Sequence, residues 1–274
     1  MIDNLKQIYL KNKDKNPLFV RNLLKESIQL YILDYIFNSK WGKSFILKGE
    51  TCLRFCFDLP RLSEDLDFDI VGLDSFDISE FTLDISDHFV KNLQFPKLVA
   101  KIAGNKRTIY LKFPIMKDLG ILGEAGESGI VHVRINFAFT PKTLYKMEVS
   151  VKSIQNLSFI IRRYSLEDLF AGKISAITTR ETIEGTVKTE RFKGRDYYDL
   201  VWFLEKGVRP NWLFIEKVTK MDRKEVLDKL NLKVETVSLK FLKEDLTPFF
   251  ENPSFVGAFV DNFSHLVKRY IKNI

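Results

Sequence analysis

A row of alternating aspartates follows a short strand–glycine–helix pattern early in the chain. Residues 45–47 form an apolar run that predicts a strand, and Gly49 marks a turn before a short amphipathic helix. Further on, Asp65, Asp67 and Asp69 alternate with apolar residues. Successive side chains of a strand point to opposite faces, so the three carboxylates are expected on one face. Because aspartate is a poor strand former and like charges repel, this row needs a neutralising partner.

Two interpretations of the aspartate row are open. It is either the solvated face of an edge strand or a site for a divalent cation, since hard carboxylate oxygens suit Mg²⁺. The row lies shortly after the start of a predicted helix, where backbone N–H groups bind phosphates. Carboxylates beside a phosphate-binding turn are the minimum needed for metal-assisted phosphoryl transfer, and this combination favours the second interpretation.

Three ordered motifs between residues 48 and 204 resemble those of a known family. They are Lys48-Gly-Glu-Thr-x-Leu-Arg54 followed by Arg61-x-Ser-x-Asp-Leu-Asp67, then Ser165-Leu-Glu-Asp-Leu-Phe-Ala-Gly-Lys173, and finally Arg195-Asp-x-x-Asp-Leu200. Together they are similar to the motifs of the AbiEii/AbiGii-type nucleotidyltransferase toxins of the polymerase-β-like superfamily. The resemblance implies an α+β fold: a polymerase-β-like mixed sheet with helices, followed by a C-terminal helical bundle. We expect a nucleotidyltransferase domain over residues 1–163 and a helical bundle domain over 164–274.

The resemblance also implies site residues. The expected catalytic residues are Asp65, Asp67, Lys173 and Asp196, and the first two would bind the metal. The expected nucleotide-binding residues are Lys48, Gly49, Thr51, Arg61 and Ser63. From the residues alone, Arg61 has three open roles: binding phosphate, orienting Asp65, or forming a surface ion pair. The implied cofactor is Mg²⁺, with Mn²⁺ as an alternative, and the implied substrate is an NTP.

The strand expected at 131–139 lacks the third carboxylate of the resembled family. It carries Arg134 and Asn136 instead. Asp69 or Asn136 substitutes for the missing acid, or the metal site uses Asp65 and Asp67 alone. We favour the last option.

Charge is distributed unevenly along the chain. Residues 1–48 carry 9 Lys and Arg against 4 Asp and Glu, residues 49–100 carry 4 against 11, and the whole chain has a net charge of +7. An acidic catalytic segment between basic flanks is compatible with a nucleic-acid acceptor. No run approaches the roughly 20 apolar residues that span a bilayer, and we expect a cytoplasmic protein without a membrane partner.

Other segments give plainer expectations. Residues 1–16 are Lys- and Asn-rich and are expected to be partly loose. A helix is expected near 79–92 with Ser79 as its cap, a Gly-rich loop over 117–129, and a strand at 130–138 that closes the sheet. The polar segment 178–193 is expected to be an exposed loop.

The resemblance implies transfer of a nucleoside monophosphate from an NTP to RNA, with tRNA 3′ ends as the leading acceptor. It also implies a toxin restrained by a separately encoded antitoxin. Two alternatives remain: a nucleotidyltransferase that modifies a protein hydroxyl, and a degenerate NTP-binding protein. Glu50 after the turn and the missing third acid suggest the latter.

Overall fold

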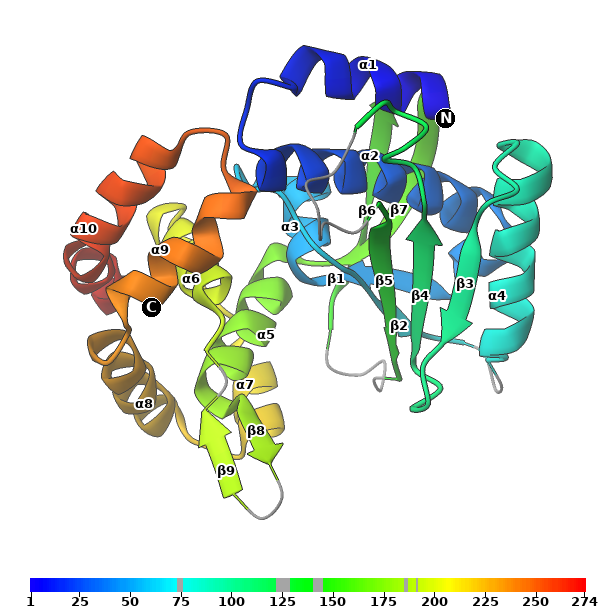
Figure 1. Ribbon diagram of the computed structural model, residues 1–274. Helices are drawn as coiled ribbons and strands as arrows, with labels where there is room; N and C mark the ends of the chain where they lie inside the picture. The colour runs from blue at the N-terminus through cyan, green and yellow to red at the C-terminus, as the bar shows by residue number, and fades with distance from the viewer. Residues whose placement is uncertain (73–75, 122–128, 140–144, 185–186, 191) are drawn as a thin grey trace. The chain divides into compact units, whose positions relative to one another are not determined.

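The computed structural model describes most of the chain in two compact units (Figure 1). The described residues are all of 1–274 except 73–75, 122–128, 140–144, 185–186 and 191. One unit comprises residues 1–143 and 147–163, and the other comprises 144–146 and 164–274.

The first unit is built on a seven-stranded mixed sheet with the strand order β3-β4-β5-β2-β1-β7-β6. The strands are β1 (Phe45–Lys48), β2 (Leu66–Ile70), β3 (Val99–Ile102), β4 (Thr108–Phe113), β5 (Val131–Ala138), β6 (Met147–Ile154) and β7 (Leu157–Tyr164). β2 lies at the centre, antiparallel to β1 and parallel to β5. The expected mixed sheet is confirmed, and the acidic strand lies in its middle, away from both edges.

The described residues of this unit form the α-helices α1 (Ile2–Asn12), α2 (Pro17–Asn38), α3 (Gly49–Phe57) and α4 (Ile78–Asp87). The expectation of a partly loose N-terminus is wrong, because α1 forms there and its Leu5 is fully buried. The expected helix near 79–92 begins at Ile78, and its cap is Asp77, whose side chain accepts from the N–H groups of Ser79 and Glu80. α2 packs against α1 and β5, and α3 packs against β1 and β2.

One face of the sheet carries an aromatic core. Phe45, Phe68 and Phe137 pack together, with Phe45–Phe68 ring centroids 5.4 Å apart, and Phe81 of α4 joins them. Phe37 of α2 contacts Phe68 on the same face. Because strand side chains alternate, Asp67 and Asp69 of β2 point to the opposite face. The helices therefore cover the aromatic face, and the aspartates lie on the other.

The sheet extends beyond the strand that was expected to close it. β7 pairs parallel with β1, and β6 forms the edge. The hairpin of β6 and β7 has an unusual pattern of apolar residues, since Val149 and Val151 of β6 face outward with 63% and 74% exposure. Its turn residues Gln155 and Asn156 both have positive φ, without the glycine that marks most such turns. The hairpin therefore lacks the usual sequence signals.

The second unit is mainly helical. Its helices are α5 (Leu166–Thr179), α6 (Gly194–Glu205), α7 (Trp212–Thr219), α8 (Arg223–Glu235), α9 (Leu239–Leu246) and α10 (Pro253–Tyr270). The expected loop at 178–193 is corrected in part: α5 continues to Thr179, and β8 (Glu181–Glu184) pairs with β9 (Val187–Glu190). Residues 185–186 and 191 of the expected loop at 178–193 lie outside the described residues, as do residues 122–128 of the expected Gly-rich loop.

The helices in the described part of the chain lack the features of a membrane span. None of them is both long and apolar enough to cross a bilayer.

The aromatic core should govern the stability of the first unit. Phe45 is fully buried among other aromatic rings, so Phe45→Ala should lower the free energy of unfolding by about 3–5 kcal/mol through lost burial and a cavity. Leu83→Ala on α4 is the control, since this side chain is 69% exposed. Urea unfolding measures both, and equal effects would contradict this account of the core.

Candidate active site

The middle of the sheet brings the acidic strand between two polar neighbours. In register, Asp67 of β2 lies opposite Lys48 of β1 and beside Asn136 of β5. Asp65 directly precedes β2, and Arg134 lies two residues before Asn136 on β5, on the same face. These five side chains come from segments far apart in sequence and meet on one face of the sheet.

The start of α3 lies directly against Asp67. Gly49 is the first residue of α3 and has a φ of 71°, a conformation that residues with a Cβ rarely adopt. A Cβ placed on Gly49 would lie 2.6 Å from Asp67 Oδ2. α3 has no side-chain cap at its N-terminus. The glycine therefore allows a helix N-terminus and a carboxylate to approach more closely than any other residue would permit.

Asp65 is held by two contacts. Its carboxylate Oδ2 accepts a hydrogen bond from Arg134 Nη2, and its backbone carbonyl accepts one from Thr51 Oγ1. Burial raises the pKa of Asp65, and the guanidinium of Arg134 acts against that shift. The same pairing raises the pKa of Arg134. Arg134 thus supplies the positive charge next to a carboxylate that is expected to bind metal.

The other two aspartates of the row have different partners. Asp67 Oδ1 accepts from Asn136 Nδ2 at 2.9 Å, and Asn136 Oδ1 in turn accepts from Thr108 Oγ1 at 3.1 Å. Asp69 is fully buried and pairs with Lys48 Nζ at 2.7 Å. Lys48, expected to bind nucleotide, is therefore the counter-ion of Asp69, with 31% of its side chain exposed.

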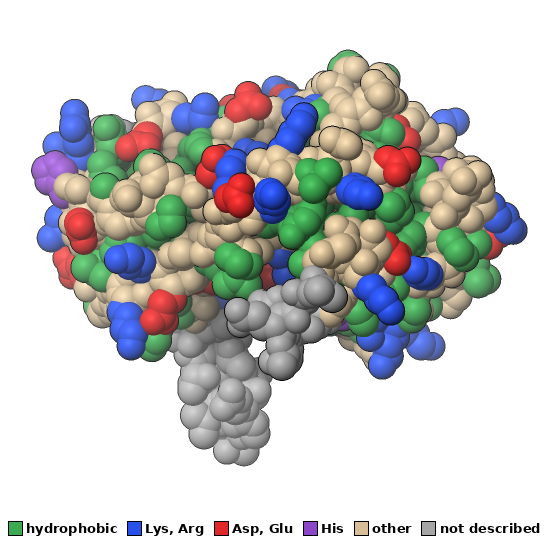
Figure 2. Space-filling model, turned by 45° about the horizontal axis from the view of Figure 1, so that its top comes forward, with side chains coloured by type: hydrophobic (Ala, Val, Ile, Leu, Met, Phe, Trp, Pro, Cys, Tyr) green, Lys and Arg blue, Asp and Glu red, His purple; other side chains and the backbone are tan. Residues whose placement is uncertain are grey.

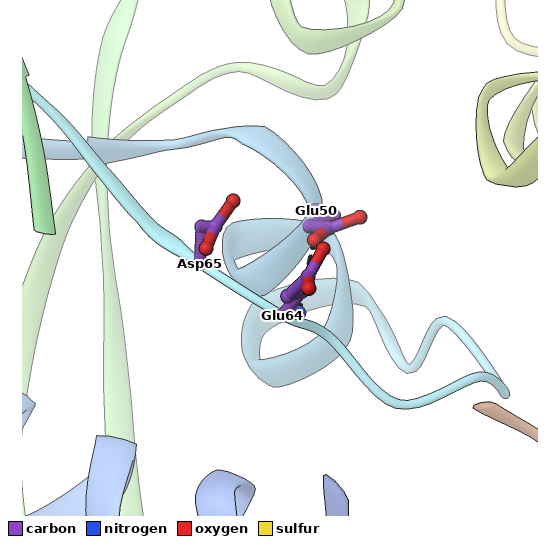
Figure 3. A group of neighbouring side chains, drawn as sticks. All are labelled: Glu50, Glu64 and Asp65. Atoms are coloured by element: carbon purple, nitrogen blue, oxygen red, sulfur yellow. Dashed lines mark hydrogen bonds between the residues drawn. The ribbon is translucent and has the colours of Figure 1, made fainter. Parts of the chain in front are cut away.

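Arg61 is part of a buried network, and the surface ion pair is excluded. Its side chain is fully buried, and its Nη2 pairs with Glu50 Oε2 at 2.9 Å. Glu50 Oε1 also accepts from the backbone N–H of Glu64 at 2.9 Å. Glu50 thus braces the segment that leads into β2, as Figure 3 shows from the position of its carboxylate beside that segment.

Ser63 and Thr51 are also turned inward. Both are fully buried, and Ser63 Oγ donates to Gln29 Oε1 at 3.2 Å while Thr51 binds the Asp65 carbonyl. Thr51, Arg61 and Ser63 were predicted to bind nucleotide, and in this structure the side chains of all three bond to other groups of the protein. Their physical effect is to fix the turn that presents Asp65.

Three carboxylates gather at this turn: Glu50, Glu64 and Asp65 (Figure 3). One oxygen atom of each lies within 4.8 Å of the others. Glu50 is already bound to Arg61, and Asp65 is bound to Arg134. This triad was not expected from the sequence, where Glu50 and Glu64 gave no signal for a metal ligand.

The second unit contains its own buried charge network. Lys173 of α5 pairs through Nζ with Asp196 Oδ1 and Asp199 Oδ2 of α6, both at 2.7 Å. Arg180 binds the second oxygen of Asp196. Burial alone would raise the pKa of Asp196, but Lys173, Lys193 and Arg180 together lower it to about 2. Asp196 and Asp199, with Lys173 and Arg180 paired to them, thus form one cluster in which Asp196 stays ionised.

Sequence reasoning placed part of this cluster correctly. Ser165 caps α5, its hydroxyl accepting from the Asp168 N–H, and this fixes where Lys173 lies on the helix. The contribution of Arg180 was missed, because it follows the end of α5 in a segment expected to be a loop. The i, i+3 spacing of Asp196 and Asp199 was the available signal that both reach one cation.

Surface charge gives a mixed picture. On the face drawn in Figure 2, basic and acidic side chains are interspersed, and the described residues show no continuous basic stripe there. The uneven distribution of charge along the sequence therefore does not appear on this face as a single positive area.

Comparison with family models gives one match, to the nucleotidyl transferase AbiEii toxin of type IV toxin–antitoxin systems, over residues 31–259. The chain belongs to this family. It is accordingly a nucleotidyltransferase toxin, and its family implies an antitoxin and a nucleotide substrate. No curated protein sequence matches the chain.

A solved structure supports the fold. MenT4, a nucleotidyltransferase toxin from Mycobacterium tuberculosis H37Rv, is 14% identical with a TM-score of 0.56, covering 98% of this chain and 89% of that one. JHP933 from Helicobacter pylori is 16% identical with a TM-score of 0.45, covering 92% of this chain and 94% of that one. At these identities the likeness to MenT4 concerns the fold alone.

The close approach of Gly49 to Asp67 should be intolerant of any side chain. Gly49→Ala requires a strained φ and places a methyl against Asp67, so it should lower the free energy of unfolding by at least about 1–2 kcal/mol. Gly104→Ala is the matched control, since its Cβ would meet nothing within 4 Å. Urea unfolding of both variants tests this, and equal stabilities would show that the approach is not constrained.

The Asp196 cluster should make the stability of the AbiEii chain pH-dependent. The folded pKa of about 2 lies below the ordinary value of 3.8, so the ionised carboxylate stabilises the fold above about pH 4, and this is lost as pH falls toward 2. At pH 6, Asp196→Asn should cost about 2 kcal/mol, and its deficit should narrow below pH 4.

Denaturant unfolding from pH 2 to 6 measures this dependence. Asp261→Asn on α10 is the control, because Asp261 is exposed. A deficit for Asp196→Asn that stays constant over this range would contradict the assigned role of the cations.

Proposed function

We propose that the chain transfers a nucleoside monophosphate from an NTP to an RNA acceptor, with release of pyrophosphate, in a Mg²⁺-dependent reaction for which Mn²⁺ can substitute. The leading acceptor is the 3′ end of tRNA. The proposal rests on membership of the AbiEii family and on one observation in the structure. That observation is the close approach of Gly49, at the start of α3, to the Asp67 carboxylate, since a Cβ on Gly49 would lie 2.6 Å from Asp67 Oδ2.

The close approach joins the two requirements of phosphoryl transfer at one place. Backbone N–H groups at a helix N-terminus favour a bound phosphate through hydrogen bonding and the helix dipole. A carboxylate immediately beside them can share a divalent ion with that phosphate. Gly49 has the conformation and lack of a side chain that allow both groups to be so close. A solvated edge strand would not require this approach.

The residues fit a divalent ion. Asp65 and Asp67 offer hard oxygen ligands, and Asn136 binds one oxygen of Asp67 and thereby orients the other toward Gly49. A bound Mg²⁺ would neutralise triphosphate charge and lower the pKa of an acceptor hydroxyl. Thr51 fixes the backbone of Asp65, and the Glu50–Arg61 pair fixes the turn before it. These contacts hold the carboxylates in position before substrate arrives.

Residues of the second unit have proposed roles in the same reaction. Lys173 is the cation that neutralises charge on the departing pyrophosphate, and Asp196 orients it through their 2.7 Å contact. For the nucleotide we propose Lys48 and the Gly49 backbone as direct contacts, with Thr51, Arg61 and Ser63 shaping the turn. We further propose that the enzyme acts in the cytoplasm and that a separately encoded antitoxin restrains it there.

The acceptor is the part of the proposal that needs a direct test. Purified chain is incubated with each α-labelled NTP, Mg²⁺ and total tRNA. Asp67→Asn should reduce transfer of label to tRNA by at least about 100-fold, since metal ligation contributes several kcal/mol to the transition state. The control is Asp87→Asn. Asp87 is an exposed residue at the end of α4 that pairs with Lys91, so this variant should transfer label as the wild type does.

The remaining outcomes separate the alternatives. Label on protein instead of tRNA would replace the acceptor by a protein hydroxyl while keeping the metal site. Bound NTP without transfer to any acceptor would establish a degenerate nucleotide-binding protein and overturn the proposal. Removal of the divalent ion by chelation should abolish transfer, and addition of Mn²⁺ should restore it.

A further inference from the structure

β5 carries two nitrogen donors on the face where the carboxylates of the site lie. Its register beside β2 places Asn136 next to Asp67, and Arg134 binds Asp65. Both carboxylates that we assign to the metal therefore accept a hydrogen bond from this one strand. The two contacts differ in kind, because the amide of Asn136 is neutral and the guanidinium of Arg134 carries a full charge.

The contact of Arg134 competes with a cation for the same oxygen. Asp65 Oδ2 accepts from Arg134 Nη2, and a divalent ion that coordinates this oxygen would have to take the place of the guanidinium. Charge repulsion adds to this, since a guanidinium and a divalent ion would both be next to Asp65 and Asp67. The neighbouring carboxylate of Glu64 favours any cation at this position, and it does not distinguish between the divalent ion and the guanidinium of Arg134.

The guanidinium is also able to leave. The side chain of Arg134 is 38% exposed, whereas that of Asp65 is 9% exposed. Arg134 Nε lies buried without a hydrogen-bond partner among the described residues, so pairing with Asp65 leaves one donor unsatisfied. A turn of the long side chain toward solvent would satisfy that donor with water. The carboxylate, in contrast, is fixed through Thr51 and its backbone.

We propose that Arg134 is an internal counter-ion of Asp65 that a divalent ion must displace, so that it sets the ion concentration at which this site fills. The inference rests on the proposed assignment of Asp65 and Asp67 as metal ligands. Arg134 is in this sense a positioning residue: it neutralises the carboxylate in the free protein and yields its place when the ion binds. Asn136, being neutral, can remain on Asp67 in both states.

The test is the affinity of the full chain for Mn²⁺ alone, measured without nucleotide by electron paramagnetic resonance. Arg134→Gln should bind Mn²⁺ about tenfold more tightly than the wild type, because a charge-assisted competitor is removed. Lys101→Gln is the matched control, because it removes one positive charge from β3. Lys101 lies opposite Tyr110 of β4, and Tyr110 lies opposite Arg134 of β5. The affinity of this control should stay within about twofold of wild type.

Unchanged or weaker Mn²⁺ binding by Arg134→Gln would overturn the inference. If this variant does not fold, the wild-type protein decides: Mg²⁺ titration followed by NMR of the arginine side chains should shift the Arg134 guanidinium signal, and an unshifted signal at saturation would refute displacement. Nucleotide transfer by the same wild-type preparation is scored separately. If the wild type transfers nucleotide but Arg134→Gln binds Mn²⁺ no more tightly, only the inference is refuted. If Arg134→Gln binds Mn²⁺ more tightly but the wild type transfers no nucleotide, only the proposed function is refuted.

Discussion

The middle of the sheet in this AbiEii chain depends on polar partners for three aspartates, Asp65 just before β2 and Asp67 and Asp69 within it. Each of them has a different partner from a different direction: Arg134 for Asp65, the Asn136 amide for Asp67, and Lys48 for Asp69. Three parallel carboxylates without such partners would repel one another and lose solvation. The order β5-β2-β1 satisfies them by placing a polar neighbour on either side of the acidic strand.

In the turn before the acidic strand, buried charged residues are also paired with one another. Arg61 and Glu50 are both buried and bound to each other, and Glu50 also binds the Glu64 N–H. A buried ion pair contributes little net stability, but removal of one partner leaves an uncompensated charge at a cost of about 3–5 kcal/mol. The pair therefore specifies one conformation of the turn. Arg61, which resembles a nucleotide ligand in sequence, is thus bound to Glu50 in this structure.

The helical unit solves an equivalent problem with two cations. Lys173 lies between Asp196 and Asp199, and Arg180 binds the free oxygen of Asp196. Because Lys173 is nearly enclosed, its position is determined by the two carboxylates and not by its flexible stem. A lysine among apolar helix neighbours usually extends to solvent, and here the paired aspartates keep it inside.

The sequence by itself determined the elements whose signals are local. The apolar run before Gly49 and the alternation around Asp67 depend on periodicity and backbone conformation within a few residues, and each forms a strand as predicted. Tertiary structure decided what these elements meet. The partnership of Asp65 with Arg134 joins residues 69 positions apart, and burial of Arg61 depends on Glu50 across a turn. Strand register and burial are set by packing of the whole unit, and no local pattern encodes them.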